Sequence, residues 1–411
     1  MPSGEHRDSR IPPLRQGLEV IPLEDDEGNA FFLIRDPLGY CSETVPLSDV
    51  AWGVAQLFDG RSTAKDLHAF LAERIHIRIP VEHIRRLADI LDEMLLLDSG
   101  AFETVRQDVE ARFLASSVRP AVHAGTSYPD EPKELAAFLS ELFAQHTTVE
   151  PRQAPVGVIA PHIDLQIGAR SYVPAYAALQ TASFDTVVVL GTSHYSMDDL
   201  FILTAKDFET PLGVMPTDRE FVEMLHDASG GTFTRCDTAH RVEHSIEFQC
   251  VFLRYLFGEK PVRMVPVLCT TFDHLFEGGR SPFDDPRFQA FARAFHETAG
   301  RLHRRVAFVL SVDWSHVGLK FDDEVPASQL LPRTREIDFS HFDALERGDI
   351  ARFHQLVLSA GNETNIDGLS CVTTFFALAR PDFGALLSYD QWHEEERESG
   401  VTYASMAFYR R

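Results

Sequence analysis

The sequence has few basic residues for its acidic content and has no long apolar run. Lys and Arg number 38 against 62 Asp and Glu, so the formal net charge is −24. Nucleic-acid backbones and anionic membrane surfaces attract clusters of Lys and Arg, and this balance argues against either as the main partner. No segment approaches the length that a membrane span needs. We therefore expect a protein with neither a nucleic-acid nor a membrane partner.

Cysteine is also scarce. The five cysteines are scattered and form no CxxC pair. An odd set without that spacing indicates neither a disulfide framework nor a zinc ribbon, so we expect most of them to be small buried hydrophobic residues. The opening MPSGEHRDSRIPPLRQG has charges and prolines where a secretion signal needs an apolar stretch. We expect the protein in a reducing cytoplasm.

The length of 411 residues favours two domains, or one large domain with an appendage. We expect a mobile leader over residues 1–19, a small domain over 20–105, a polar linker over 106–118 and an α/β domain over 119–411. In the small domain, strand signals accompany three segments with helical period. This combination predicts a winged-helix-like α+β module.

One segment of the small domain resembles the PqqD-like family, whose members bind a peptide leader or a partner protein. Its sequence is LFDGRSTAKDLHAFLAE…IRRLADILDEMLLLDSG. An ordinary helical appendage is the equal alternative, because the pattern is mostly helix periodicity. DNA binding is disfavoured, since no basic recognition helix is present. We expect Thr63 to cap the second helix, Pro80 to start the third and Gly100 to lie just beyond its end.

The large domain alternates strand and helix signals. Its short Val-rich runs are VGVIAP, TVVVLGTSH, VRMVPVLC and RVAFVLSVDWSH, and longer stretches of helical period separate them. This alternation predicts an α/β fold, with a central mixed sheet flanked by helices.

Histidines follow three of these strand runs. His162 and His194 each come directly after a run, and Asp313 and His316 end a third. A single histidine at a strand end is usually a hydrogen-bonded loop residue, but its repetition after several strands favours a function. Because the carboxyl ends of strands in an open α/β sheet face one crevice, we expect these residues to converge.

A fourth group, Glu243, His244 and Glu247, lies where an amphipathic helix begins. Neutral imidazoles with a carboxylate suit Fe(II), Zn(II) or Cu(II). Such imidazoles need an oxygen that holds the second ring nitrogen, and Asp164, Glu243, Glu247 and Asp313 are the expected holders. The sequence therefore predicts a metal site with an open choice of metal.

Two other interpretations of LGTSHY have less support than a metal site. A phosphate loop would need the GxxxxGK[ST] pattern, which is absent. Ser193 as a hydrolase nucleophile would need a GxSxG elbow, and that too is absent. The hydrolase reading stays a minor alternative.

Seven ordered motifs carry a family resemblance: RPAVHAGTSYPDEPKELAAFL, VGVIAPHIDLQIGARSYVPAYAAL, VVVLGTSHY, EHSIEFQCVFL, VPVLC, SVDWSHVG and NIDGLSCVTTFFAL…VTYASMAFY. From about Arg119 onward the chain resembles the Memo family, whose bacterial members are called AmmeMemoRadiSam system protein B. The resemblance implies a fold like that of the LigB-type, non-haem iron extradiol dioxygenases. It also implies two partners, an AMMECR-type protein and a radical SAM enzyme.

The resemblance places His162 and His194 at the family's metal-histidine positions and gives His244 the role of active-site acid or base. Ser315 stands where some members have a cysteine ligand. A hydroxyl is a poorer ligand than a thiolate, which argues against copper and against thiolate redox chemistry. The expected third ligand then becomes His316 or His244.

Together with the strand-end histidines, the resemblance implies a Memo-like oxidoreductase or dioxygenase that binds Fe(II), with Zn or Cu as alternatives. The assigned metal ligands are His162, His194 and His316, and the assigned catalytic residues are His244, Asp313 and Glu243. The competing hypothesis is a non-catalytic adaptor with a vestigial metal site. Such an adaptor would bind a peptide or partner protein through residues 20–105.

Overall fold

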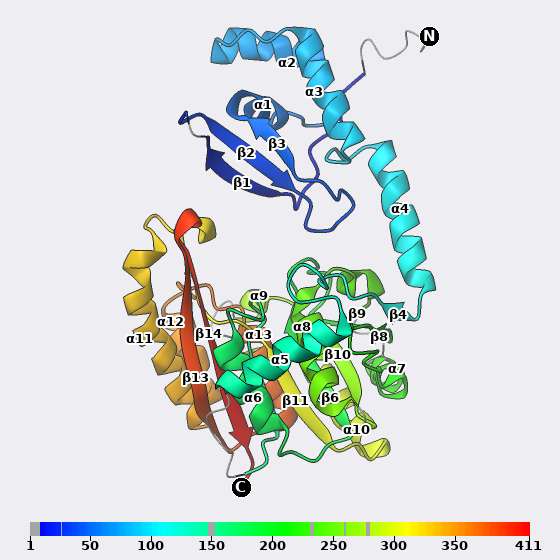
Figure 1. The fold of residues 1–411 in the computed structure, drawn as a ribbon, viewed down its shortest axis with the longest axis vertical. Coiled ribbons are helices and arrows are strands. Elements are labelled where there is room, and N and C mark those ends of the chain that lie inside the picture. Colours follow the sequence, from blue (N-terminus) through cyan, green and yellow to red (C-terminus); the bar gives the residue numbers. More distant parts are fainter. Residues whose placement is uncertain (1–8, 26, 147–152, 231–233, 259, 277–279) are drawn as a thin grey trace. The chain divides into compact units, whose positions relative to one another are not determined.

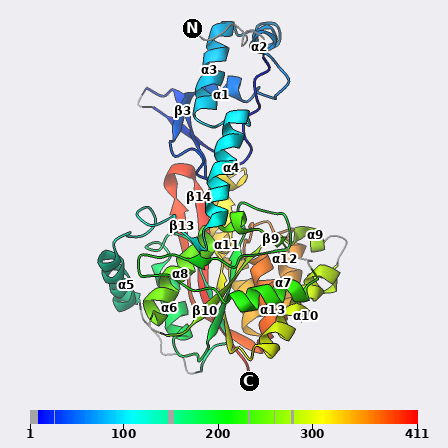
Figure 2. The same cartoon turned by 90° about the vertical axis from the view of Figure 1, so that its right-hand side faces the viewer.

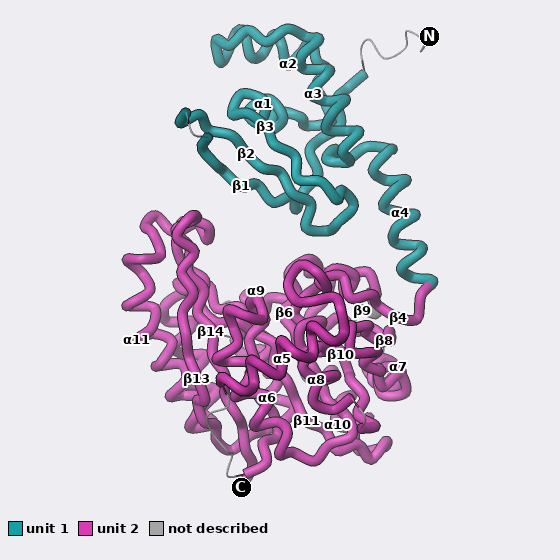
Figure 3. Tube along the Cα trace, viewed as in Figure 1, with its two compact units in different colours: residues 1–115 teal, residues 116–411 magenta. Residues whose placement is uncertain are grey.

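The structure is a computed structural model that describes residues 9–25, 27–146, 153–230, 234–258, 260–276 and 280–411. The chain divides into two compact units, unit 1 over Met1–Ala115 and unit 2 over Ser116–Arg411 (Figure 3). All five cysteines are free, and four of them are buried, as expected. Among the described residues, no helix combines the length and apolar character that crossing a membrane requires.

Unit 1 contains an antiparallel sheet in the order β1-β2-β3, with helices packed against it. Its elements are β1 (Glu19–Glu24), β2 (Ala30–Arg35), β3 (Val45–Ser48), α1 (Asp49–Ala55), α2 (Ala64–Phe70), α3 (Val81–Glu93) and α4 (Gly100–Ala115). A single π-helical turn over Leu71–Ile75 continues α2. The unit has its own buried core, which includes Ile34, Ile84 and Leu91.

The helix starts predicted in unit 1 are confirmed. Thr63 caps α2 in a capping box with Asp66, and Pro80 is the N-cap of α3. The predicted place of Gly100 is wrong, because α3 ends at Glu93 and Gly100 opens α4. Helix α4 then runs to Ala115, through most of the segment predicted to be a linker.

Unit 2 is built on a nine-stranded mixed sheet in the order β12-β14-β5-β11-β6-β10-β7-β9, with β13 paired to β14 (Figure 1). The four central strands β5, β11, β6 and β10 are parallel and are the four predicted Val-rich runs. Figure 2 shows the long antiparallel β13–β14 hairpin in red. The strands of the unit are β4 (Val118–Arg119), β5 (Gly157–Ala160), β6 (Thr186–Thr192), β7 (Phe201–Leu203), β8 (Asp207–Phe208), β9 (Thr234–Arg235), β10 (Arg263–Cys269), β11 (Val306–Ser311), β12 (His316–Gly318), β13 (Phe383–Glu394) and β14 (Ser399–Tyr409).

Helices cover both faces of this sheet, so the predicted central mixed sheet flanked by helices is confirmed. The helices of the unit are α5 (Pro132–His146), α6 (Ala169–Leu179), α7 (Arg219–Ala228), α8 (His244–Phe257), α9 (Asp273–Phe276), α10 (Pro286–Arg301), α11 (Ala327–Glu346), α12 (Ile350–Ser359) and α13 (Leu369–Ala379). Along β6, Val188 and Leu190 enter one buried core while Val187 and Val189 enter the other. This two-residue alternation, apolar on both faces, explains why the strand reads as a continuous Val-rich run.

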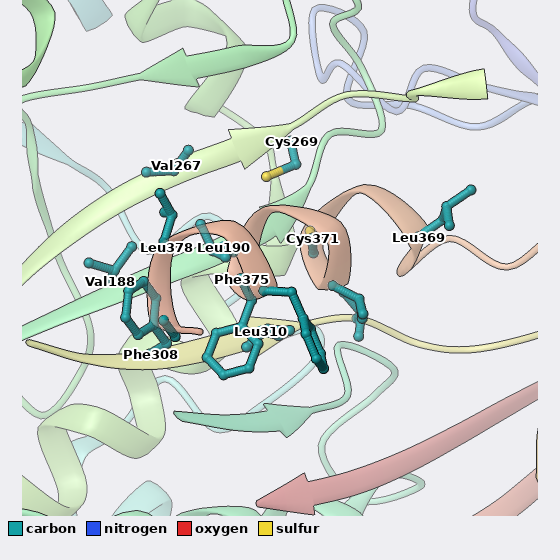
Figure 4. Close-up of a cluster of buried hydrophobic side chains, with 14 of the residues drawn as sticks. Val188, Leu190, Val267, Cys269, Phe308, Leu310, Leu369, Cys371, Phe375 and Leu378 are labelled. Carbon is teal, nitrogen blue, oxygen red and sulfur yellow. The ribbon is translucent and has the colours of Figure 1, made fainter. Parts of the chain in front are cut away.

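Helix α13 packs on one face of the parallel strands. Figure 4 shows its Phe375 and Leu378 beside Val188 of β6, Val267 of β10 and Leu310 of β11. On the other face, α6 contacts β5 and α8 contacts β6 and β11. The carboxyl ends of β5, β11 and β6 therefore lie side by side, between α8 and the connection that leads into α13.

Candidate metal centre

Three histidines meet at the carboxyl edge of the parallel strands. His162 lies two residues after β5, His194 lies two residues after β6, and His244 is the first residue of α8. One potential ligand atom from each lies within 4.8 Å of the other two. The ring centroids are 5.0 Å apart for His162 and His194, and 4.7 Å apart for His194 and His244. We call these three residues the histidine cluster.

His162 is oriented by two groups at the end of β11. Its backbone N–H donates to Oδ1 of Asp313 at 2.9 Å, and its Nδ1 lies 3.0 Å from the carbonyl oxygen of Ser311. A carbonyl can only accept, so Nδ1 carries the proton and Nε2 is left for a ligand. Nε2 lies 3.0 Å from Oδ2 of Asp367 and 3.8 Å from Oδ2 of Asp313.

His194 is held by Glu243, as the sequence predicted. Oε1 of Glu243 lies 2.9 Å from Nδ1 of His194, and Oε2 accepts the His194 backbone N–H at 2.8 Å. Glu243 is also the N-cap of α8, where its side chain accepts the N–H of Ser245. Gly191 allows this arrangement, because a Cβ there would lie 2.6 Å from Oγ of Ser245. Because Gly191 has no side chain, α8 can approach β6 closely.

His244 completes the cluster from the first turn of α8. Its Nδ1 lies 3.4 Å from Oε1 of Glu243, so one buried carboxylate faces two of the three imidazoles. Burial, followed by the neighbouring His194, holds the pKa of His244 well below its usual value. A neutral imidazole is the form that binds a metal.

The electrostatics of the cluster favour a cation. Burial alone would lower the pKa of His162, but Asp313 and Asp367 outweigh it and raise that pKa to about 10. Burial raises the pKa of Asp313. Burial would also raise the pKa of Glu243, but the neighbouring His194 and His244 outweigh it and hold that pKa well below its usual range. These carboxylates stabilise positive charge on the imidazoles. The same carboxylates would stabilise a divalent cation bound at the free imidazole nitrogens. The imidazole nitrogens and nearby carboxylates are therefore suitable donors for a metal ion.

Two of the four predicted ring holders have other partners. Glu247 forms a buried ion pair with Arg119 and accepts the N–H of His123 at 3.0 Å. Asp164 caps its own turn by accepting the N–H groups of Gln166 and Ile167. Neither carboxylate reaches the cluster. The side chain of Asp313 accepts the backbone N–H of His162, and its Oδ2 lies 3.8 Å from Nε2 of the ring.

His316 is not brought into the cluster. After β11 the chain turns away into β12, where His316 pairs with Val401 of β14. Its Nδ1 faces the carbonyl of Asn365 at 3.3 Å, and its ring packs on Phe321. The strand-end rule fails here because four residues separate the end of β11 from His316.

Ser315 also points away from the cluster. It is fully buried, and its Oγ donates to Oδ1 of Asp338 at 2.6 Å. Ser193 uses its hydroxyl to donate to the carbonyl of Ser196 at 2.6 Å. The arrangement gives no support to Ser193 as a hydrolase nucleophile.

Asp367 was missed by the sequence reasoning. It lies in the connection between α12 and α13, far in sequence from the other site residues, and the only signal was its position in the quoted NIDGLS motif. A pocket of about 280 Å³ opens beside the cluster, and its lining includes Asp367 and His194. His123 was missed as well, and its ring centroid lies 5.9 Å from that of His244.

Comparison with known proteins gives one consistent result. A family model described as Memo-like protein matches residues 119–407. A MEMO1 family protein from Aquifex aeolicus (strain VF5) is 31% identical over 388 residues, which cover 92% of this chain and 96% of the relative. One from Thermus thermophilus is 27% identical over 332 residues, covering 80% and 94%. The Aquifex alignment covers more of this chain than unit 2 alone provides, so the similarity extends into unit 1.

Proposed function

The chain belongs to the Memo family, and we propose that its unit 2 is a mononuclear non-haem Fe(II) protein that acts as an oxidoreductase, in the manner of a dioxygenase. The observation that carries the proposal is the histidine cluster, whose ligand atoms lie within 4.8 Å of one another. His162 and His194 each have their second nitrogen held by an oxygen, as metal-binding histidines do. Zn and Cu are the alternative metals.

The residues around the proposed iron site have different roles. Fe(II), when bound, supplies the electron chemistry that lets dioxygen oxidise a substrate. His162, His194 and His244 would hold the ion, with His244 as a ligand in place of His316, which lies outside the cluster. Glu243 fixes the ring of His194 by a hydrogen bond to Nδ1 and lies 3.4 Å from Nδ1 of His244. Asp313 directs Oδ2 toward the cluster, 3.8 Å from Nε2 of His162, where it can accept or return a proton.

The pocket beside the cluster is the proposed substrate site. Its volume of about 280 Å³ suits a small molecule, and the described lining residues include no Lys or Arg. Hydroxyl and amide groups from Thr192, Thr270 and Asn362 line it together with apolar Phe272 and Leu369. We therefore expect a small substrate whose charged groups, if it has any, bind the metal ion, because the described lining offers the carboxylates of Asp273 and Asp367 but no cationic side chain.

We propose three further properties that the family resemblance implies. They are a LigB-type dioxygenase-like fold, the identity of AmmeMemoRadiSam system protein B, and cooperation with a radical SAM enzyme and an AMMECR-type protein. Unit 1 would be a PqqD-like, winged-helix-like module that docks a peptide or one of these partners. Exposed Phe70, Ile75 and Ile77 near the end of α2 support a docking role. Five unpaired cysteines suit a reducing cytoplasm.

Metal analysis of anaerobically purified protein tests the metal site. The wild type should hold one equivalent of iron, and His162→Ala and His194→Ala should each lose most of it. His316→Ala is the matched control, since His316 lies outside the cluster, and it should retain the iron. Metal content unchanged by His162→Ala and His194→Ala would contradict the proposal. Oxygen consumption by the iron-loaded protein with candidate substrates then tests the reaction.

The second candidate is an adaptor whose metal site is vestigial. The observation that favours it is unit 1, a separate compact body with exposed apolar side chains near the end of α2. Co-expression with a radical SAM enzyme and an AMMECR-type protein tests the adaptor role, and oxygen consumption by the iron-loaded protein separates it from the oxidoreductase. An adaptor should bind its partner when His162 and His194 are replaced by Ala. It should lose the partner when Phe70 and Ile75 are replaced by Ser.

A further inference from the structure

Asp367 is a largely buried carboxylate whose one charged partner among the described residues is the ring of His162. Its side chain is 14% exposed, and both Oδ1 and Oδ2 are buried atoms without a donor in hydrogen-bond geometry. Burying a carboxylate in this way is unfavourable unless a cation binds it. The buried negative charge of Asp367 is therefore stabilised only if a positively charged group lies beside it.

The distance from Asp367 to the cluster matches a shared ion. Oδ2 of Asp367 lies 3.0 Å from Nε2 of His162, the nitrogen that the Ser311 carbonyl leaves free. Two ligand atoms that each lie about 2.1 Å from one ion are about 3 Å apart in an octahedral site and about 3.4 Å apart in a tetrahedral one. The pair is thus already spaced as neighbouring ligands of one metal.

The backbone holds Asp367 in this position. Its N–H donates to the carbonyl of Trp314, just after β11, at 3.3 Å. Gly368 follows, and a Cβ at that position would lie 3.1 Å from Cβ of Val312. The preceding Asn362 and Asn365 have positive φ values of 53° and 47°, a conformation that asparagine tolerates. The loop therefore lies tightly against the end of β11, which brings Asp367 to the cluster.

The other nearby acid is less suited to bind the ion. Oδ1 of Asp313 already accepts the N–H groups of His162 and Ile163, and its Oδ2 is 3.8 Å from Nε2 of His162. Asp367 has neither restriction.

We propose that Asp367 is a carboxylate ligand of the ion bound by His162, His194 and His244, an inference that rests on the proposed function. The resulting set of three imidazoles and one carboxylate contains no sulfur. Nitrogen and oxygen donors of this kind suit Fe(II), Mn(II), Co(II) and Zn(II) and disfavour Cu(I), which prefers thiolate and thioether ligands. Asp367 also lines the substrate pocket, so the carboxylate ligand is on the side from which a substrate enters.

Titration of the full-length apoprotein with Co(II) under anaerobic conditions tests the assignment. Co(II) serves as the probe because its visible absorption reports the ligand set, while calorimetry gives affinity and stoichiometry. Asp367→Asn keeps the shape of the side chain and removes its charge. It should weaken Co(II) binding by at least about 10-fold and change the visible spectrum, while the stoichiometry stays at one. Asp164→Asn, an acid near His162 that caps its own turn, is the matched control and should bind as the wild type does.

The outcomes separate the two proposals. If Asp367→Asn binds Co(II) with wild-type affinity and spectrum while His162→Ala does not bind, the ligand role of Asp367 is overturned and the metal centre stands. If His162→Ala also binds as the wild type does, the proposed function falls as well. Should Asp367→Asn fail to fold, Asp367→Glu carries the test, because moving the carboxylate by one methylene must change the Co(II) spectrum if it is a ligand. An unchanged spectrum in folded Asp367→Glu would overturn the proposal.

Discussion

Glu243 holds His194 at two points, through Nδ1 of the ring at 2.9 Å and through the backbone N–H at 2.8 Å. A buried carboxylate in this position fixes the tautomer of the imidazole and increases its basicity as a ligand. The same carboxylate caps α8 and faces His244, so it couples the strand-end histidine to the helix-start histidine.

Glu243→Gln should therefore weaken iron binding without removing a ligand. The amide oxygen can still accept from Nδ1 of His194, but the negative charge that strengthens the ligand is gone. Loss of such a partner lowers metal affinity by about 10- to 100-fold. Competition with a chelator measures the change, with the exposed Glu223→Gln on α7 as control. Wild-type affinity in Glu243→Gln would contradict this role.

Ser315→Cys should not restore a thiolate ligand. The Ser315 side chain is buried against Asp338, and both Thr402 and Tyr389 donate to the same carboxylate. A thiol is a weaker donor than the hydroxyl, so the variant should lose about 1 kcal/mol of unfolding free energy. Its iron affinity should stay unchanged. A sulfur-to-metal charge-transfer band in the iron-loaded variant would contradict the orientation of residue 315.

Arg119 and Glu247 form an ion pair in which both side chains are 0% exposed. Arg119 also donates to the backbone carbonyls of His240 and Glu243, so the pair supports the segment that carries the cluster's carboxylate. Arg119→Met leaves a buried charge unpaired and should cost about 3–5 kcal/mol of unfolding free energy. Urea unfolding provides the measurement.

The exposed pair of Arg219 and Asp207 gives the matched control for that prediction. Arg219 is 47% exposed, so Arg219→Met should change stability by less than about 1 kcal/mol. Replacing Arg119 by Met and Glu247 by Gln together should recover part of the loss. Equal effects of Arg119→Met and Arg219→Met would show that the buried pair contributes no more than the surface pair.

Buried His341 should make the protein less stable in acid. Burial lowers the pKa of His341 to about 4, from 6.5 for an ordinary histidine. As the pH falls below 6.5, the unfolded chain takes up a proton that the folded protein binds only near pH 4, so the unfolding free energy decreases. Between pH 7 and pH 5 this one group should account for a loss of about 2 kcal/mol. Urea unfolding of His341→Phe at both pH values should show a smaller decrease than the wild type, and an equal decrease would refute the prediction.

The sequence predicted the sheet and two members of the cluster for one physical reason. Buried parallel strands read as Val-rich runs, and their carboxyl ends share an edge, so the residues that follow β5 and β6 had to meet. His162 and His194 come directly after those strands. Glu243 was found because it precedes an amphipathic helix in the same motif as His244.

The remaining site residues depend on tertiary contacts that no local pattern carries. His316 follows the end of β11 by several residues, and pairing with β14 takes it away from the shared edge. Glu247, one helical turn after Glu243, faces Arg119 instead of the cluster. Asp367 reaches His162 only because the loop before α13 packs against the end of β11. These three outcomes follow from chain direction and packing, which sequence spacing does not encode.

The position of the metal can be seen in an anomalous diffraction map collected at the iron absorption edge from anaerobic crystals of the iron-loaded wild type. We expect one peak at the carboxyl edge of the parallel strands, about 2.0–2.2 Å from an imidazole nitrogen of each of His162, His194 and His244. A peak elsewhere in the chain, or no peak in protein shown to contain iron, would contradict it.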